Sequence, residues 1–249
     1  MKPEVQYGFY LDTTKCTGCK TCHVACKDRM VGSQRGQGEG GKDEGAKGIS
    51  AMKGVLWRRV YEYGGGEWKT NEDGTFEQDV FAYYMSIGCN HCNEPACVKY
   101  CPTGAMHKRK EDGLVHVNQE LCIGCESCAC ACPYDAPQLD PERKVMTKCD
   151  GCFERLAVGR QPICVESCPL RALDFDTMDK LQAKYGKGDG HIAPLPSPEI
   201  TKPNLIIKAN RHGRPVKESI GICYGEPWPV GSEPKLNLVE GSILNPAEV

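Results

Sequence analysis

Short segments along the chain alternate apolar and polar side chains, as strands with one buried face do. Residues 5–11, 81–87, 113–118 and 172–175 have this pattern. Residues 55–68 (VLWRRVYEYGGGEW) are typical of a further strand that runs into a turn. The pattern therefore predicts an α+β arrangement built from short elements.

A surface helix is predicted over residues 177–186 (TMDKLQAKYG), with Gly186 as its stop signal. No stretch approaches the roughly 18 consecutive apolar residues that a membrane-spanning helix needs. The N-terminal sequence MKPEVQYGFYLDTTKC lacks the apolar run of a secretory signal. Alone, this N-terminus would indicate the cytoplasm, unless the chain is exported already folded beside a partner that carries the signal.

Two regions are expected to be irregular. Residues 31–50 are rich in Gly and charge, which is typical of a flexible surface insertion. From about residue 193 the chain is Pro-rich, and a tail of this kind often lies along a partner. Trp57 and Trp68 are expected to pack against the body of the chain or against a partner subunit.

Composition changes this picture, because cysteine is in large excess. The chain has 18 Cys among 249 residues, with 28 Gly and 17 Pro, whereas only 7% of residues are aromatic. A chain this poor in large apolar side chains needs disulfides or metal to hold it together. Its 31 Lys and Arg against 33 Asp and Glu leave no basic excess, which argues against a nucleic-acid-binding role.

Sixteen of the cysteines fall into four groups, each of which ends in the spacing C-x3-C. Groups one and three have the spacing C-x2-C-x2-C-x3-C, group two has C-x2-C-x4-C-x3-C, and group four has C-x2-C-x11-C-x3-C. Proline directly follows groups two, three and four. In order, the groups are Cys16, Cys19, Cys22 and Cys26; Cys89, Cys92, Cys97 and Cys101; Cys122, Cys125, Cys128 and Cys132; and Cys149, Cys152, Cys164 and Cys168.

This spacing suits [4Fe–4S] cubanes. Cysteines two residues apart in a tight loop can surround one corner of a cluster, and the cysteine three residues on is carried away by the start of a short helix. In bacterial two-cluster ferredoxins this fourth cysteine binds the other cluster of the pair. The sequence therefore predicts four [4Fe–4S] clusters held by sixteen cysteines, in interlocked pairs.

Other uses of cysteine explain the pattern less well. Disulfides do not require repeated runs of this spacing, and thiols so close in one loop are poor partners for each other. Zinc ribbons use two C-x2-C knuckles with a longer spacer, so only group four would pass for one. His23 and His91 lie within the groups, but the sixteen cysteines already fill the ligand positions.

Interlocking requires that the groups be paired. Groups two and three are close in sequence and form a natural pair, which leaves groups one and four to pair across the chain. The alternatives are that each group closes its own cluster, or that groups one and two pair. The first scheme gives cluster a with Cys16, Cys19, Cys22 and Cys168; cluster b with Cys149, Cys152, Cys164 and Cys26; cluster c with Cys89, Cys92, Cys97 and Cys132; and cluster d with Cys122, Cys125, Cys128 and Cys101.

Two cysteines and one basic run are not part of this ligand scheme. Cys130 lies two residues from both Cys128 and Cys132; the repeat selects Cys128, and Cys130 is expected to be a small buried residue. Cys223 stands alone in the tail and is expected to be a bystander. The basic run at residues 107–110 (HKRK) would raise the potential of a nearby cluster, or would be a solvated turn.

Beyond the cysteines, the chain resembles the iron–sulfur subunits of molybdopterin oxidoreductases, and in particular the dimethyl sulfoxide reductase branch. The resembling strings reach to about residue 204 and include QYGFYLD, FAYYMSIGCNHCNEPAC, LCIGCESC, ACPYDAPQ and MTKCDGC. Cysteine spacing identifies only the superfamily, whereas YEYGGGEW and CPLRALDF indicate this branch. Some relatives have Trp at the position of Cys125, so this chain is expected to hold a complete cluster there. The insertion at residues 31–50 is longer than the family pattern.

The resemblance implies two pseudo-symmetric ferredoxin-type modules. One would comprise residues 1–30 and 145–180 with groups one and four, and the other residues 80–140 with groups two and three. Residues 31–79 would form an insertion and strand segment, and residues 181–249 a partner-contacting tail. The implied partners are a molybdopterin-containing catalytic subunit and a quinol-oxidising membrane anchor. After folded export beside the catalytic subunit, the complex would lie on the extracytoplasmic face of the membrane.

The predicted function is an electron relay through the four clusters, without chemistry on a substrate. The sequence contains no nucleophile–base pair or acid–base constellation that would suggest an active site. Electrons would pass from quinol through the clusters to a terminal reductase of the dimethyl sulfoxide type. Thiosulfate, polysulfide, tetrathionate, selenate and arsenate reductases are alternatives. A free-standing soluble polyferredoxin, and a zinc-stapled module without redox activity, are different classes of function that remain open at this point.

Overall fold

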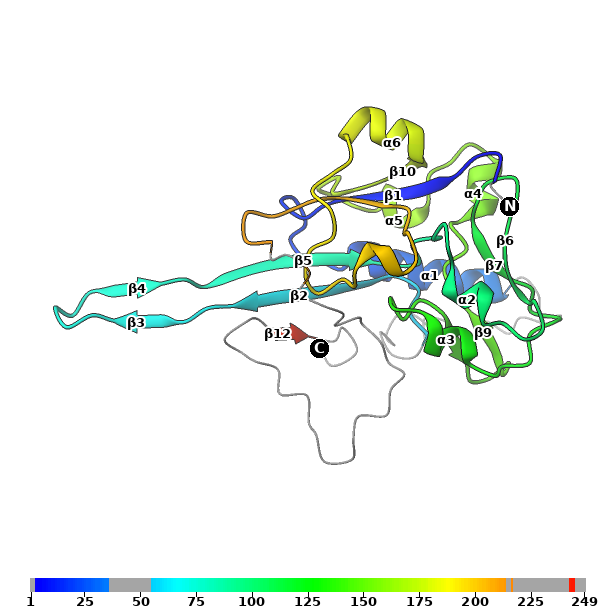
Figure 1. Cartoon of the computed structure of the whole chain (residues 1–249), viewed down its shortest axis with the longest axis horizontal. Coiled ribbons are helices and arrows are strands. Elements are labelled where there is room, and N and C mark those ends of the chain that lie inside the picture. The colour runs from blue at the N-terminus through cyan, green and yellow to red at the C-terminus, as the bar shows by residue number, and fades with distance from the viewer. Residues whose placement is uncertain (1–2, 36–54, 214–215, 217–241, 245–249) are drawn as a thin grey trace.

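The computed structural model describes residues 3–35, 55–213, 216 and 242–244, and its elements are short (Figure 1). The strands are β1 (Tyr7–Asp12), β2 (Arg59–Gly65), β3 (Trp68–Thr70), β4 (Phe76–Gln78), β5 (Phe81–Ile87), β6 (Met106–Lys108), β7 (Val115–Val117), β8 (Gln138–Asp140), β9 (Val145–Thr147), β10 (Leu173–Thr177), β11 (Leu205–Lys208) and β12 (Ser242–Leu244). The helices are α1 (Thr21–Arg35), α2 (Ala96–Lys99), α3 (Ser127–Ala131), α4 (Phe153–Ala157), α5 (Ile163–Glu166) and α6 (Met178–Tyr185), with a 3-10 turn, η1, at Pro198–Ile200.

A three-stranded sheet joins segments from opposite ends of the chain. Its order is β10–β1–β11, with β1 antiparallel to β10 and parallel to β11. On one face the rings of Phe9 and Phe175 lie 4.6 Å apart. On the other face α6 covers β1, and the ring of Tyr185 stacks on that of Tyr10 at 3.6 Å. The sequence placed strands at both β1 and β10, and these predictions are confirmed.

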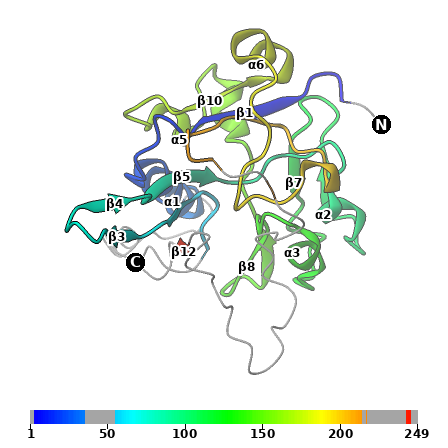
Figure 2. The same cartoon turned by 60° about the vertical axis from the view of Figure 1, so that its left-hand side comes forward.

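A second sheet forms a long projecting arm. Strands β2 and β5 pair antiparallel from Arg59 opposite Ile87 to Gly65 opposite Phe81, and the pairing continues outward as the hairpin β3–β4. Figures 1 and 2 both show this hairpin extending well beyond the body of the protein. The predicted strand at residues 81–87 is confirmed, and the predicted strand and turn at residues 55–68 correspond to β2 and the start of β3.

Two pairs of short helices and two small hairpins complete the body. Helix α1 packs against α5, and α2 packs against α3. Hairpin β6–β7 follows α2 along the sequence, and hairpin β8–β9 follows α3. Group one thus leads into a helix that contacts the helix of group four, while the helices of groups two and three contact each other.

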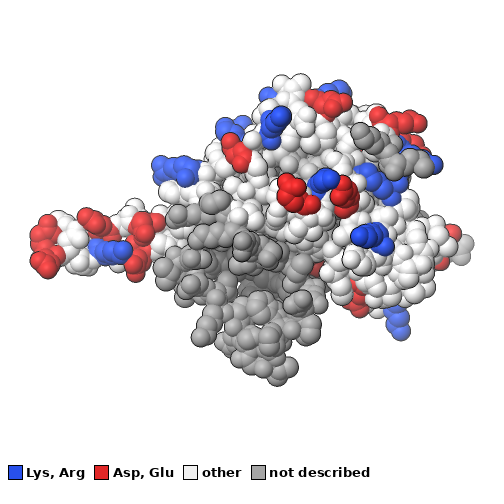
Figure 3. All heavy atoms as spheres, in the orientation of Figure 1, with Lys and Arg blue, Asp and Glu red and all other residues white. Residues whose placement is uncertain are grey.

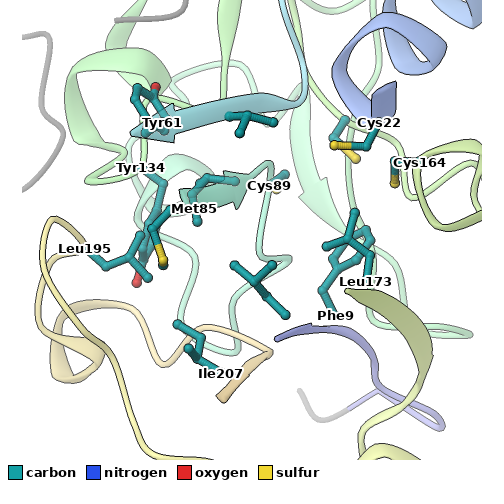
Figure 4. Packing of buried hydrophobic residues seen from close by; sticks show 14 of the residues in the cluster. Phe9, Cys22, Tyr61, Met85, Cys89, Tyr134, Cys164, Leu173, Leu195 and Ile207 are labelled. Carbon is teal, nitrogen blue, oxygen red and sulfur yellow. The ribbon is translucent and has the colours of Figure 1, made fainter. Parts of the chain in front are cut away.

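Cysteine side chains are a substantial share of the buried core. The largest buried cluster includes Phe9, Met85, Tyr134 and Leu173 together with cysteines of groups one to four. Figure 4 shows Cys22, Cys89 and Cys164 among these apolar side chains. The apolar residues therefore form a shell around the thiols rather than a core apart from them.

The region after residue 193 differs from the irregular tail that we expected. Residues 205–208 form β11 beside β1, and the consecutive side chains of Ile206 and Ile207, both less than 5% exposed, are buried in different apolar clusters on the two faces of the sheet. Helix α6 is confirmed, with Thr177 as its N-cap and Gly186 as its C-cap. The insertion at residues 31–50 lies largely outside the described residues, apart from the last residues of α1. Among the helices that the structure describes, none is long and apolar enough to cross a membrane.

Candidate metal centres

The four cysteine groups share one backbone turn. In the first C-x2-C pair of each group, the residue before the second cysteine has a positive φ: 70° at Gly18, 44° at His91, 67° at Gly124 and 69° at Gly151. Glycine adopts this left-handed conformation without strain, whereas His91 adopts it inside a fully buried loop. The repeat seen in the cysteine spacing is therefore also a repeat of backbone conformation, which turns successive thiols toward the same side.

Two small cavities are ringed by cysteines from different groups. One is lined by the three loop cysteines of group one and by Cys168 of group four. The other is lined by the three loop cysteines of group three and by Cys101 of group two. These are the combinations that the sequence assigned to clusters a and d. They arise because the last cysteine of each group lies in or just after a helix that packs against the helix of the other group.

The thiols assigned to clusters b and c also lie together, as their mutual electrostatic effects show. Burial raises the pKa of Cys26 well above its ordinary value, and Cys149, Cys164 and Cys152 raise it further.

Burial likewise raises the pKa of Cys97, with added contributions from Cys89, Cys132 and Cys92. An unpaired thiolate in such a site is unfavourable, since burial and like charge both disfavour it. Bound iron would remove that penalty by neutralising the thiolates.

Polar groups point at several of these sulfurs. Backbone N–H groups donate to sulfur from Met106 to Cys101 and from Met146 to Cys122, each at 3.3 Å. A third backbone N–H, that of Ala172, donates to Cys168, also at 3.3 Å. Hydrogen bonds of this kind stabilise cluster-bound thiolates and tune their potentials.

The donor set fits a cluster better than a single metal ion or disulfides. All seventeen cysteines within the described residues are free. Within the same residues, no three His, Cys, Asp or Glu side chains converge closely enough to hold one metal ion. A cubane offers four separate iron atoms, so its ligands surround a cavity instead of meeting at a point.

The four sets follow one another through the protein. Cys164 of set b is close enough to Cys22 of set a to raise its pKa, and Cys89 of set c is close enough to Cys149 of set b to do the same. Sets c and d share helices α2 and α3, since Cys97 and Cys101 bracket the C-terminal end of α2. The arrangement is therefore a line in the order a, b, c, d.

The ends of this line reach the surface, whereas its middle does not. Every cysteine of sets b and c is buried, but Cys19 of set a and Cys125 of set d are exposed. Electron exchange with other proteins requires end sites near the surface, and this distribution supplies one at each end.

Two predictions about neighbouring residues need correction. Cys130 is exposed, not buried, because α3 turns it away from the side on which Cys128 and Cys132 lie. The basic run at residues 107–110 is not simply a solvated turn, since Lys108 points inward and its Nζ donates to the carbonyl oxygens of Cys92 at 2.8 Å and His91 at 3.2 Å. Burial lowers the pKa of Lys108 to about 8. Cys223 lies outside the described residues.

The two histidines within the groups are buried. The backbone N–H of Val115 donates to His91 Nδ1 at 2.9 Å, so the neutral ring carries its proton on Nε2. His91 Nε2 has no hydrogen-bond partner among the described residues. An orphaned buried donor beside a cysteine loop fits the presence of an acceptor at that place, such as the sulfur of a bound cluster.

Sequence reasoning missed several polar residues that face the thiols. Ser86, on β5, contacts Cys22, and the side chains of Arg58 and Lys148 are buried among the cysteines of neighbouring sets. Lys148 directly precedes Cys149 at the end of an otherwise buried strand. That position in the sequence could have identified it as a buried cation near the thiols. Arg58 and Ser86 give no such signal, because they reach the thiols only through the pairing of β2 with β5.

A family profile described as a 4Fe-4S dicluster domain matches residues 80–178. The chain is 54% identical over 209 residues to the B subunit of the anaerobic dimethyl sulfoxide reductase of Haemophilus influenzae, covering 84% of this chain and 92% of that protein. It is 51% identical over 216 residues to the subunit of the same name from Escherichia coli, covering 87% and 95%. With the formate dehydrogenase-O iron-sulfur subunit of Escherichia coli it shares 33% identity over 177 residues, covering 69% and 53%. The chain therefore belongs to the family of iron–sulfur subunits of the anaerobic dimethyl sulfoxide reductases.

Proposed function

We propose that this chain is the electron-transfer subunit of a dimethyl sulfoxide reductase-type complex and holds four [4Fe–4S] clusters. The observation that supports the proposal is a pair of cavities lined by cysteines of two groups each, one by groups one and four and the other by groups two and three. Each cluster, when bound, would accept and release one electron. The similarity to the dimethyl sulfoxide reductase B subunit, and more distantly to a formate dehydrogenase iron-sulfur subunit, supports a relay role within a molybdoenzyme.

The ligand sets are those that the sequence assigned. Two cavities lined by cysteines support sets a and d, and the mutual effects of buried thiols support sets b and c. In this proposal the protein positions the four sets in line, excludes water from b and c, and donates hydrogen bonds to the sulfurs. These contributions fix the spacing and the potentials of the relay.

The proposed partners are a molybdopterin catalytic subunit at one end of the line and a quinol-oxidising membrane anchor at the other. Exposed Cys19 and Cys125 support this two-ended arrangement, because each lies where another subunit could come close. The terminal substrate is then reduced by the catalytic subunit, and dimethyl sulfoxide is the substrate that the family indicates. The complex is proposed to lie on the extracytoplasmic face of the membrane.

Elemental analysis of the protein purified without oxygen from its native host tests this proposal. About 16 Fe per chain, no zinc and roughly one molybdenum are expected for four cubanes within a molybdoenzyme complex. Iron without molybdenum would instead favour a free-standing polyferredoxin. Zinc in place of iron would overturn the redox role altogether.

A further inference from the structure

Arg58 is buried in the middle of the protein without a carboxylate partner. Its side chain is 3% exposed, its Nη1 donates to the Ser86 carbonyl oxygen at 3.1 Å and contacts Ser86 Oγ at 3.3 Å, and the guanidinium lies 4.5 Å from the centre of the Phe9 ring. Among the described residues, no Asp or Glu forms an ion pair with it. A buried cation without a counter-charge is strongly unfavourable, so the fold must supply negative charge by other means.

The groups nearby that can supply negative charge are cysteines of two adjacent sets, which are thiolates when they bind iron. The ionisable groups that act most strongly on its guanidinium are Cys164, Cys22, Cys149 and Cys26. Of these, Cys22 belongs to set a and the other three to set b. Ser86 links the guanidinium to Cys22 directly, since its Oγ lies 3.2 Å from Cys22 Sγ.

Lys148 lies between sets b and c, as Arg58 lies between sets a and b. It is 4% exposed, and its Nζ donates to the backbone carbonyl oxygens of Val115 and Cys149, the latter at 2.6 Å. The charged or ionisable groups that act most strongly on its ammonium group are Cys89, Cys149, Cys97 and Asp150. Cys149 belongs to set b, and Cys89 and Cys97 belong to set c.

A nearby arginine shows what a conventional pairing looks like. Arg29 also lies beside set b, but both of its terminal nitrogens bind the carboxylate of Asp150, at 3.1 and 2.9 Å. Its charge is thereby neutralised within the protein. Arg58 and Lys148 have no such neutralising carboxylate ion pair among the described residues. Their positive charge can therefore act on the clusters that the neighbouring cysteines would bind.

We propose, building on the four-cluster relay above, that Arg58 and Lys148 are internal counter-cations placed between successive clusters: Arg58 between a and b, and Lys148 between b and c. Each one-electron reduction adds a negative charge to a cluster, and a fixed cation nearby stabilises that charge and raises the potential. Because one cation lies between two clusters, it raises the reduction potentials of both clusters and preserves the difference between the two potentials.

Redox titration of the purified complex, followed by electron paramagnetic resonance, tests this proposal. In Arg58→Met, clusters a and b should both become harder to reduce by at least about tenfold in the reduction equilibrium, about 59 mV for a one-electron couple. Clusters c and d should not shift. Arg58→Lys keeps the charge and should restore most of both potentials. Lys148→Met should lower the reduction potentials of clusters b and c in the same way. Lys180→Met, on exposed α6, should leave all four potentials unchanged.

Iron content separates failure of this inference from failure of the relay itself. Four clusters with unchanged potentials in Arg58→Met would overturn the counter-cation role and leave the relay standing. A shift confined to cluster a would indicate that Arg58 acts only by orienting Ser86, and would also overturn it. If Arg58→Met does not assemble, Arg58→Lys and Lys148→Met still decide the question. A wild-type protein without iron would remove the relay and this inference together.

A second, independent observation concerns the projecting hairpin β3–β4. In its register Trp68 lies opposite Gln78 and Thr70 opposite Phe76, which places Trp68 and Phe76 on one face and Lys69 and Glu77 on the other. Trp68 and Phe76 are each 68% exposed. Two large aromatic side chains exposed on one face of a projecting arm are typical of interface anchors.

Charge indicates which kind of partner the arm contacts. Residues 67–79 contain five acidic side chains and one lysine, and Figure 3 shows acidic residues gathered along the arm. An anionic lipid surface would repel such a segment.

The arm also starts beside set a, because Tyr84 of β5 covers Gly18 so closely that an added Cβ would lie 2.3 Å from its ring.

The opposite end of the line has a different surface. Near Cys125, the side chains of Ile123 and Tyr100 are 66% and 58% exposed. An apolar surface of this kind suits a membrane subunit better than the acidic arm does. The two ends are therefore distinguishable by their chemistry.

We propose that the arm binds the water-exposed catalytic subunit of the proposed complex. Trp68 and Phe76 would enter an apolar pocket of that subunit, and basic side chains would surround the pocket. This assignment rests on the proposed function and adds the surface through which the catalytic subunit is held. Set a would then be the end that delivers electrons to it.

Co-purification of the whole complex in detergent tests the arm. In Trp68→Ser/Phe76→Ser, molybdenum per iron should fall at least about tenfold, as expected for loss of two anchor residues, while iron per chain and the bound anchor stay unchanged. Lys69→Ser/Glu77→Ser changes the other face of the same hairpin and should retain molybdenum. Retention of molybdenum in the aromatic variant, loss of the membrane anchor instead, or loss of a dimer of this protein would each overturn the proposal. A wild-type complex without molybdenum would remove the proposed function first, and this partner with it.

Discussion

Ser86 Oγ lies 3.2 Å from Cys22 Sγ, although 64 residues separate them in sequence. The contact joins the C-terminal end of β5 to the first turn of α1, so the sheet from which the arm projects directly supports set a. A hydroxyl that donates to a cluster-bound thiolate stabilises the reduced state.

Replacing Ser86 with Ala should therefore lower the potential of cluster a alone. We expect a smaller change than that of Arg58→Met, with iron content unchanged, in a redox titration monitored by electron paramagnetic resonance. Ser127→Ala is the matched control, because Ser127 makes the equivalent contact with Cys125 at 3.4 Å and should shift cluster d instead. Equal shifts in all clusters for either variant would contradict this local effect.

Gly18→Ala should prevent assembly of cluster a. Its φ is 70°, and a Cβ there would lie 2.3 Å from the Tyr84 ring, so both strain and overlap oppose the substitution. Iron should fall from about 16 to about 12 per chain. Gly104→Ala is the control: its φ is 67°, but nothing lies within 4 Å of an added Cβ. It should cost about 1–3 kcal/mol of stability through backbone strain alone and keep all the iron.

Cys130 and Cys128 offer a direct test of the ligand assignment in group three. Cys130→Ser should keep its full iron content and all four spectroscopic signals, because its thiol is exposed and points away from the cavity of set d. Cys128→Ser should lose or convert cluster d. The reverse outcome, with Cys130 required and Cys128 dispensable, would show that the repeat spacing was misassigned.

His116 should make the protein less stable as the pH falls. Burial, with Lys148 and Arg109 nearby, lowers the pKa of His116 from 6.5 to about 4. The folded protein keeps this imidazole neutral, whereas the unfolded protein takes up a proton below pH 6.5, so stability present above pH 6.5 is lost as the pH falls toward 4. The rate of cluster loss in urea should rise over this interval. In His116→Asn that rise should be smaller, and an identical pH profile in both proteins would exclude His116 as the source.

Local signals in the sequence were sufficient to predict much of this structure. Strands such as β5 and the helix α6 follow from alternation and from a Thr cap with a Gly stop, which are properties of consecutive residues. The pairing of cysteine groups stays a prediction, which the spacing of each run, a loop followed by a helix, makes possible. These are features that depend on neighbours within a few positions in the sequence.

Features that depend on strand pairing were not predictable. Arg58 reaches the thiols only because β2 pairs with β5, and nothing near it in sequence marks it as a buried cation. The strand β11 was missed because its apolar run is short and surrounded by prolines, so that only its alignment with β1 makes it a strand. The direction of Cys130 required the actual course of α3, since its spacing to Cys128 and Cys132 is symmetrical.

The sheet β10–β1–β11 has a consequence for how the protein is made. β1 is synthesised first, yet its partners are complete only when residues 177 and 208 have left the ribosome. The hairpins β6–β7 and β8–β9, by contrast, pair residues close in sequence and can form as soon as they emerge. We therefore expect cysteine sets c and d, which are complete once residue 132 has emerged, to take up iron while β1 still lacks its partners, and sets a and b, which need residues 149–168, to take it up later.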